Sequence, residues 1–123
     1  SKKDLLAMKT RIQVYKAMKF YGNVVNHASA LAKILVRYVE RPNFRIHYFD
    51  VMYELITSLY LYGAKTEGPK GAKAIQNAAE RFVLLKKNFP DLGGDVPRGR
   101  FKAFLKDHDK FAEKVKEVET AQK

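Results

Sequence analysis

Residues 44 to 62 read FRIHYFDVMYELITSLYLY, a stretch that is apolar nearly all round a helix. A helix with apolar residues on every side is normally buried at the centre of a protein. Asn43 is a natural N-terminal cap and Gly63 a natural stop, so the stretch predicts one helix of about twenty residues. The rest of the chain has to supply the helices that cover it.

The segments on both sides have apolar residues at helical spacing, separated by turn residues. The predicted helices run from about Asp4 to Tyr21 with Gly22 as the stop, from Asn23 or Asn26 to Pro42, from about 72 to Pro90, and from about 97 to the end. No segment alternates in the way that is typical of a strand. The sequence predicts an all-α fold, an antiparallel bundle of four to five helices with the aromatic third helix central, in one domain over residues 1–123.

The composition bounds the class of protein. Hydrophobic residues make up 46% of the 123 residues, too many for a disordered chain, and the absence of cysteine excludes disulfides and thiolate metal sites. The apolar run at residues 5–8 is cut short by Lys9, well under the length of a secretory signal, so we expect an intracellular protein without a transmembrane segment. Many lysines and no cysteine are also typical of thermostable proteins.

The central helix carries one narrow polar stripe, formed by His47, Asp50, Glu54 and the pair Thr57 and Ser58. In helical bundles such a stripe holds metals only when facing helices supply matching ligands, and these are missing here. Buried carboxylates are otherwise paired or neutralised. We therefore expect Asp50 and Glu54 to form ion pairs with a cation of a neighbouring helix, with Arg11 as the candidate.

The chain offers no pattern that is typical of catalysis. No serine or cysteine is set beside a base, and the Gly- and Lys-rich run at 68–73 lacks the spacing of a phosphate-binding loop. Arg41 and His47 have the spacing of the helical HEPN ribonucleases, but Pro42 separates them into different helices. We expect no catalytic residue, no metal site and no cofactor, and thus a protein that is not an enzyme.

Charge is the stronger signal, since 24 Lys and Arg stand against 13 Asp and Glu and leave a net charge of +11. Lys33, Arg37 and Arg41 repeat every four residues, an arrangement that costs helix stability through like-charge repulsion. In the last helix, lysines interleave with acids, which indicates a solvated surface. The candidate nucleic-acid- or anion-binding residues are Lys9, Lys16, Lys33, Arg37, Arg41, Lys70, Lys73, Arg81, Arg98, Arg100 and Lys102.

Three of these cations, Arg98, Arg100 and Lys102, lie where a Gly- and Pro-rich loop leads into a helix, the position most suited to a phosphate. An excess of positive charge without acids nearby favours a polyanionic partner. Nucleic acid, DNA in the first place, and an acidic protein both fit this description, and simple solvation of the cations is the alternative. Self-association is a further option.

Three parts of the chain carry a diffuse resemblance to a known family: the run KTRIQVYK at residues 9–16, the aromatic third helix, and the run PRGRF at 97–101. Together they resemble the small, basic, all-helical virion structural proteins of crenarchaeal viruses, including two-tailed viruses of hyperthermophilic archaea. The resemblance implies a virion structural protein, located in the virion and in the host cytoplasm during assembly. A related family member inhibits the host RNA polymerase, so a regulator that binds RNA polymerase or another nucleic-acid-handling complex is the alternative.

Overall fold

The computed structural model describes residues 2–122, with Lys2 described by its backbone alone. These residues form helices and no strand. The elements are α1 (Lys2–Ala17), α2 (Tyr21–Leu35), the 3-10 turn η1 (Val36–Tyr38), α3 (Pro42–Ala64), α4 (Pro69–Asn88), α5 (Asp95–Asp107) and α6 (Asp109–Ala121). The all-α prediction is confirmed for this part of the chain, whereas the predicted bundle of four to five helices is not, because six α-helices form.

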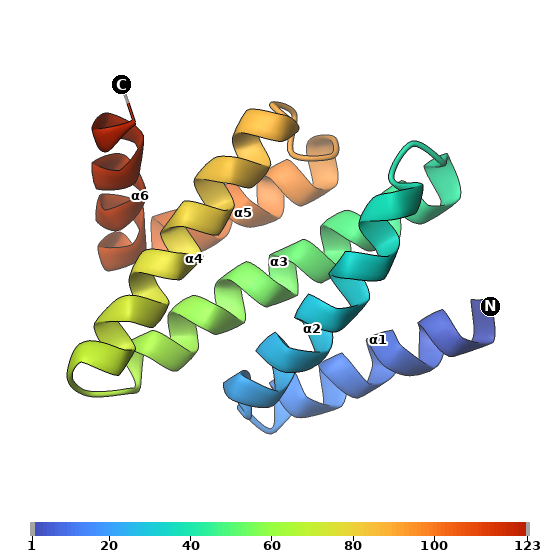
Figure 1. The fold of residues 1–123 in the computed structure, drawn as a ribbon, viewed down its shortest axis with the longest axis horizontal. Coiled ribbons are helices and arrows are strands. Elements are labelled where there is room, and N and C mark those ends of the chain that lie inside the picture. The colour runs from blue at the N-terminus through green and yellow to red at the C-terminus, as the bar shows by residue number, and fades with distance from the viewer. Residues whose placement is uncertain (1, 123) are drawn as a thin grey trace.

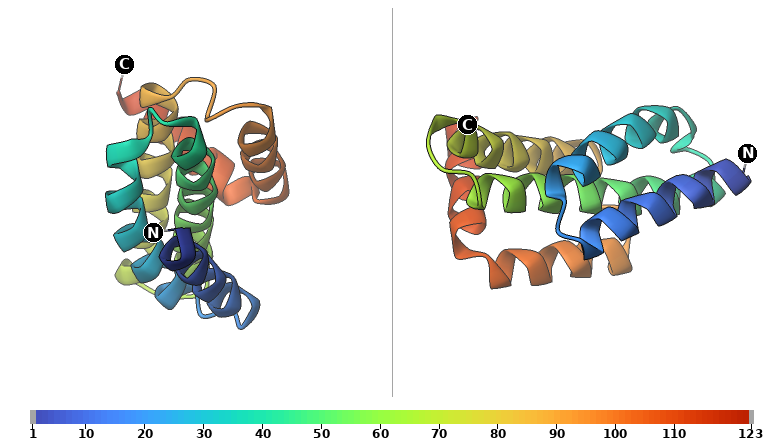
Figure 2. Two further views of the ribbon diagram at one scale, coloured as in Figure 1. Left: turned by 90° about the vertical axis from the view of Figure 1, so that its right-hand side faces the viewer. Right: turned by 90° about the horizontal axis from the view of Figure 1, so that it is seen from below.

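The helices form three layers, of which α3 is the middle one. Figure 1 shows α3 running through the middle of the molecule, with α1 and α2 towards one end and α4, α5 and α6 towards the other. Both views in Figure 2 place α2 and α4 on one side of α3, and α1 and α5 on the opposite side. Helix α3 packs against all four of these helices, while α6 packs against α4 and α5. Contact on two sides explains why α3 is apolar nearly all round.

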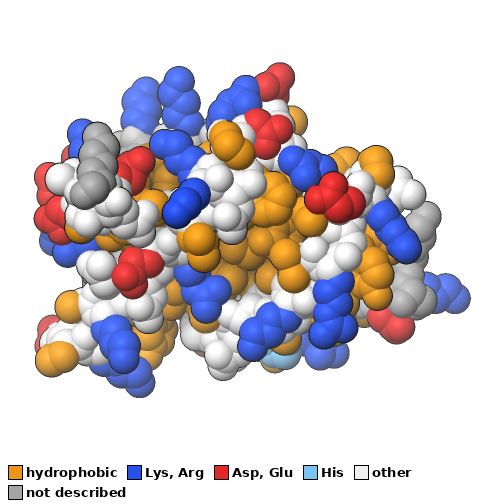
Figure 3. Space-filling view, turned by 45° about the horizontal axis from the view of Figure 1, so that its top comes forward, with side chains coloured by type: hydrophobic (Ala, Val, Ile, Leu, Met, Phe, Trp, Pro, Cys, Tyr) orange, Lys and Arg blue, Asp and Glu red, His pale blue; other side chains and the backbone are white. Residues whose placement is uncertain are grey.

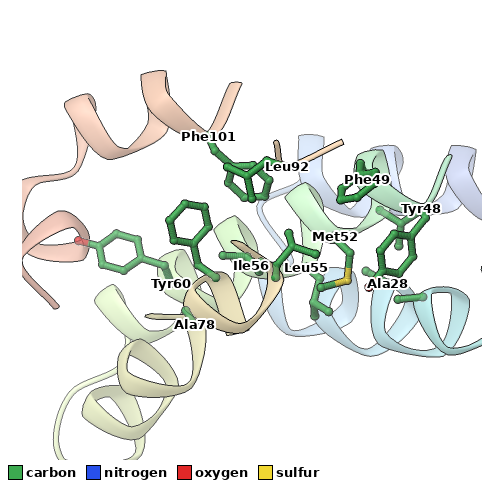
Figure 4. Close-up of a cluster of buried hydrophobic side chains, with 14 of the residues drawn as sticks. Ala28, Tyr48, Phe49, Met52, Leu55, Ile56, Tyr60, Ala78, Leu92 and Phe101 are labelled. Carbon is green, nitrogen blue, oxygen red and sulfur yellow. The ribbon is translucent and has the colours of Figure 1, made fainter. Parts of the chain in front are cut away.

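The core follows α3 from end to end. Figure 4 shows it extending from Ala28 and Tyr48 at one end to Tyr60 at the other. Near Tyr60 the packing is aromatic: the Tyr60 ring lies 5.1 Å from the Phe111 ring, and the Phe82 ring lies 5.0 Å from the Phe101 ring, measured between centroids. Phe101 and Phe111 are fully buried there.

The first helix ends earlier than predicted, at Ala17 rather than near Tyr21. Lys19 takes the left-handed conformation with φ of 61°, and its N–H donates to the Lys16 carbonyl at 2.9 Å. The N–H of Phe20 donates to the Tyr15 carbonyl at 2.9 Å. These two bonds make the helix-ending reversal in which the left-handed residue is usually a glycine. Gly22, the predicted stop, lies instead in the first turn of α2.

Both predicted ends of the central helix are also corrected. The N-cap of α3 is Arg41 and its first residue is Pro42, so Asn43 lies inside the first turn. Proline suits this position because the missing N–H would have no partner there. Gly63 lies within the last turn, and a Cβ there would come within 2.7 Å of the Gly71 carbonyl oxygen of α4. Gly63 therefore allows a close approach of two helices and does not end α3.

The last predicted helix is two helices. The chain breaks at His108, which has φ of −134° and ψ of 79°, and α6 turns away to pack against α4. The His108 ring stacks on Phe104 with a centroid separation of 3.9 Å, and its Nδ1–H donates to the Phe104 carbonyl at 2.9 Å. The side chain thus replaces one helical hydrogen bond at the break.

Candidate anion-binding groove

The acidic stripe of α3 lies against α1 and α5, and the expected ion pairs form there. Glu54 is only 3% exposed, and its Oε1 accepts from Lys16 Nζ at 2.8 Å. Its Oε2 accepts from Gln13 Nε2 at 2.6 Å. The prediction of ion pairs is therefore confirmed, but Arg11 is the wrong partner, because its side chain is exposed and forms no ion pair with the described residues.

Asp50 lies one turn before Glu54 and forms ion pairs with both α1 and α5. Its Oδ2 is 3.1 Å from Lys9 Nζ, and its Oδ1 is 3.4 Å from an Arg100 guanidinium nitrogen. Lys9 Nζ also donates to His47 Nδ1 at 2.9 Å. The Arg100 guanidinium lies over the Tyr53 ring, 4.1 Å from its centroid. Three candidate anion-binding residues, Lys9, Lys16 and Arg100, thus contact carboxylates of α3 and tie three helices together.

Cations around the start of α5 are also paired with acids. Arg98 forms an ion pair with Asp95, three residues earlier in the first turn. Arg45 of α3 lies 3.6 Å from Asp91 in the same loop. Lys102 is exposed and has no ion-pair partner among residues 2–122. The position that the sequence favours most for a phosphate is therefore partly neutralised by neighbouring carboxylates.

The structure brings two other candidates, Lys33 of α2 and Arg81 of α4, to the same depression. We call it the α2–α4 groove, with a volume of about 310 Å³. It is defined by Lys33 and Val36 on one wall, Tyr48 and Met52 on the floor, and Arg81 and Leu84 on the other wall. No acidic residue lines the groove in the described part of the chain. Figure 3 shows apolar side chains in a hollow of this face, with Lys and Arg and also acidic side chains at its rim.

The groove exists because of the way α2 and α4 sit on α3. They pack on the same side of α3 but make little or no contact with each other. Part of the α3 surface, including Met52, therefore forms a floor between them. Burial raises the pKa of the Tyr48 phenol above its usual value, so Tyr48 adds no negative charge to the floor near neutral pH.

The remaining candidates lie beside the groove or apart from it. Arg37 follows Lys33 by one turn, and Lys70 and Lys73 precede Arg81 along α4. These cations, like Lys33 and Arg81, are exposed and have no ion-pair partner in the described part of the chain. Arg41 is placed differently, with its guanidinium 5.3 Å from the centroid of the Tyr38 ring.

The apolar part of the groove is absent from the sequence-based prediction. Val36 is 43% exposed and Leu84 is 56% exposed, and both lie beside the unpaired cations. One signal could have indicated Leu84, since it lies three residues after Arg81 on the same side of a predicted helix. No spacing of residues in the sequence indicates that α2 and α4 lie on the same side of α3.

Neither a metal site nor a membrane-spanning helix is found within residues 2–122. No three His, Asp or Glu side chains there are grouped closely enough to hold a metal ion. None of the helices formed by these residues combines the length and the apolar character needed to cross a membrane. The described chain is an all-α protein with a cation-flanked groove. Comparison with protein-family models, curated proteins and solved structures finds no match.

Replacing Arg100 with alanine is expected to lower the free energy of unfolding by about 1 kcal/mol, because it removes a cation–π contact and a partner of Asp50. Lys102→Ala is the matched control on the same helix, and its effect should stay within about 0.5 kcal/mol. Urea unfolding followed by far-UV circular dichroism measures both. Equal effects of the two substitutions would show that Arg100 does not tie α5 to α3.

Proposed function

We propose that the protein is a non-enzymatic structural protein that binds an anionic macromolecule through the α2–α4 groove. One observation carries the proposal: Lys33 and Arg81 face each other across the groove without any carboxylate in its lining. By contrast, the cations beside the acidic stripe of α3 are paired, as Lys16 is with Glu54. Cations left unpaired on two neighbouring helices repel one another, and an anionic partner relieves that repulsion.

Three further unpaired cations lie on the elements that form the two walls of the groove. Arg37 lies beyond Lys33, and Lys73 and Lys70 lie along α4 before Arg81. A bound polyanion would exchange condensed counterions for these side chains, so its affinity falls as salt is added. DNA and an acidic protein both meet this requirement, and both remain within the proposal.

The setting that we propose is the virion of an archaeal virus, with assembly in the host cytoplasm. The resemblance to virion structural proteins of crenarchaeal viruses supports this setting, and the basic all-α chain is consistent with it. Mass spectrometry of purified particles of the virus that encodes the chain tests it, and absence from clean particles would rule it out. Recovery of the chain in equal amounts with host RNA polymerase would favour the alternative, a polymerase regulator.

Reversing both groove charges, with Lys33→Glu and Arg81→Glu together, is expected to weaken binding to anionic polymers roughly tenfold at low salt. Both side chains are exposed and unpaired, so the fold should be retained. Fluorescence anisotropy with labelled duplex DNA and with labelled polyglutamate measures the affinity for the two kinds of partner.

The control reverses the same number of charges outside the groove, with Lys110→Glu and Lys116→Glu on α6, where both side chains are exposed. This variant has the same net charge as the groove variant and should lose much less affinity. Equal losses in the two variants would mean that overall charge acts without the groove. Failure of the unchanged protein to bind either polymer would reject the proposed function.

A further inference from the structure

The α2–α4 groove has walls and a floor that could accommodate a further helix. Helices α2 and α4 lie on the same side of α3 and leave part of the α3 surface between them as a floor. Ser29 to Val36 form one wall and Arg81 to Asn88 the other, each about two helical turns or roughly 10 Å long. A helix laid on this floor would contact three helices at once, which is the usual way to bury an apolar stripe.

The walls are aliphatic as well as basic. Leu84 and Val36 are about half exposed, and Met52 lies between them on the floor. Sugar and phosphate groups would leave these aliphatic side chains without an apolar partner. Nucleic-acid bases are usually held by exposed aromatic rings, but the Tyr48 ring on the floor is only 7% exposed. The lining therefore favours aliphatic side chains over a nucleic acid.

We propose that the occupant of the groove is an acidic amphipathic helix of a partner protein, an inference that rests on the proposed function and narrows it to one partner class. The apolar face of that helix packs chiefly on Val36 and Leu84, above Met52, which is 8% exposed. Acidic residues on its two flanks reach Lys33 on one side and Arg81 on the other. Charge complementarity selects the acidic helix, because the lining holds two cations and no acid.

The test uses two synthetic peptides of about 14 residues, roughly four helical turns. The first has leucines at positions i, i+3, i+4 and i+7, with glutamates on both flanks of this apolar stripe. The second has the same composition in scrambled order, so the net charge is equal and the stripe is lost. A single-stranded and a duplex oligonucleotide of equal charge are measured beside them by fluorescence anisotropy. We expect the patterned peptide to bind about tenfold tighter than the scrambled one, the equivalent of burying one leucine.

Two variants locate the binding. Leu84→Ser removes an exposed apolar side chain from the groove, and Val14→Ser removes one that is 51% exposed on α1, outside the groove. We expect Leu84→Ser to weaken the patterned peptide several-fold and to leave the oligonucleotides unchanged, whereas Val14→Ser changes neither. The double variant of Lys33 and Arg81 to glutamate should weaken both peptides.

The outcomes separate this inference from the proposed function. Equal binding of the patterned and scrambled peptides, weakened by charge reversal at Lys33 and Arg81, would overturn the helix and retain an anion-binding groove. An oligonucleotide that binds tighter than the patterned peptide, with an affinity unchanged by Leu84→Ser, would assign the groove to nucleic acid. This result would also overturn the inference of a helical partner. If the double variant of Lys33 and Arg81 bound every probe as tightly as the unchanged protein, both the helical partner and the anion-binding groove would be overturned.

Discussion

Replacing Glu54 with lysine is expected to destabilise the protein by about 3–5 kcal/mol, the usual cost of breaking a buried ion pair. Glu54 is 3% exposed and accepts from Lys16 at 2.8 Å and from Gln13 at 2.6 Å. The introduced ammonium group would lie beside Lys16 and near Arg100, with no carboxylate at its own position. Urea unfolding followed by circular dichroism gives the change in free energy.

The control for this charge reversal is Glu80→Lys. Glu80 is exposed on α4 and has no ion-pair partner among residues 2–122. The two substitutions change the net charge equally, but the change at Glu80 should cost no more than about 0.5 kcal/mol. Comparable losses would show that Glu54 acts through the overall charge and does not join α1 to α3.

Replacing Gly71 with alanine is expected to cost about 3 kcal/mol, at the upper end of the range for overpacking. A Cβ on Gly71 would lie 1.8 Å from the Thr66 carbonyl oxygen and 2.8 Å from the Gly63 carbonyl oxygen. Both atoms belong to the backbone, so no side chain can rotate away to make room. The turn between α3 and α4 would have to shift, and thermal or urea unfolding measures the loss.

Gly99→Ala is the matched control, because Gly99 lies inside α5 and a Cβ there meets nothing within 4 Å. Alanine is the better helix former, so this substitution should stabilise the protein by roughly 0.5–1 kcal/mol. Opposite signs at the two glycines would identify the close approach of α3 and α4 as the cause. A loss at Gly99 similar to that at Gly71 would contradict this explanation.

The helix ends show why part of the fold escapes prediction. Gly22 is a reasonable stop, yet the left-handed residue is Lys19, a side chain for which this conformation is unfavourable. His108 breaks the last helix although no glycine or proline stands there. The break lets α6 turn and pack against α4. Local preferences of about 1 kcal/mol decide such ends only where packing does not oppose them.

The candidate site, like the helix ends, is predicted by the sequence only in part. The sequence offers eleven candidate cations, favours Arg98, Arg100 and Lys102 among them for a phosphate, and predicts Arg11 as the partner of the acids. In the structure Lys9, Lys16 and Arg100 contact the acids of α3, whereas Lys33 and Arg81 remain unpaired beside a groove. The role of Lys33 and Arg81 in binding stays a prediction. The exposed Val36 and Leu84 belong to the candidate site only because the fold places α2 and α4 on the same side of α3.

The sequence by itself determined that the described chain is helical and that the segment around Phe49 and Leu55 is buried. Both properties follow from residue spacing and apolarity, which act over a few neighbouring residues. Tertiary structure alone decided which cations are paired, since Lys9 and Asp50 stand 41 residues apart and meet at 3.1 Å. It also left α2 and α4 apart on α3. The energy of an ion pair depends on distance and burial, and only the folded chain sets these.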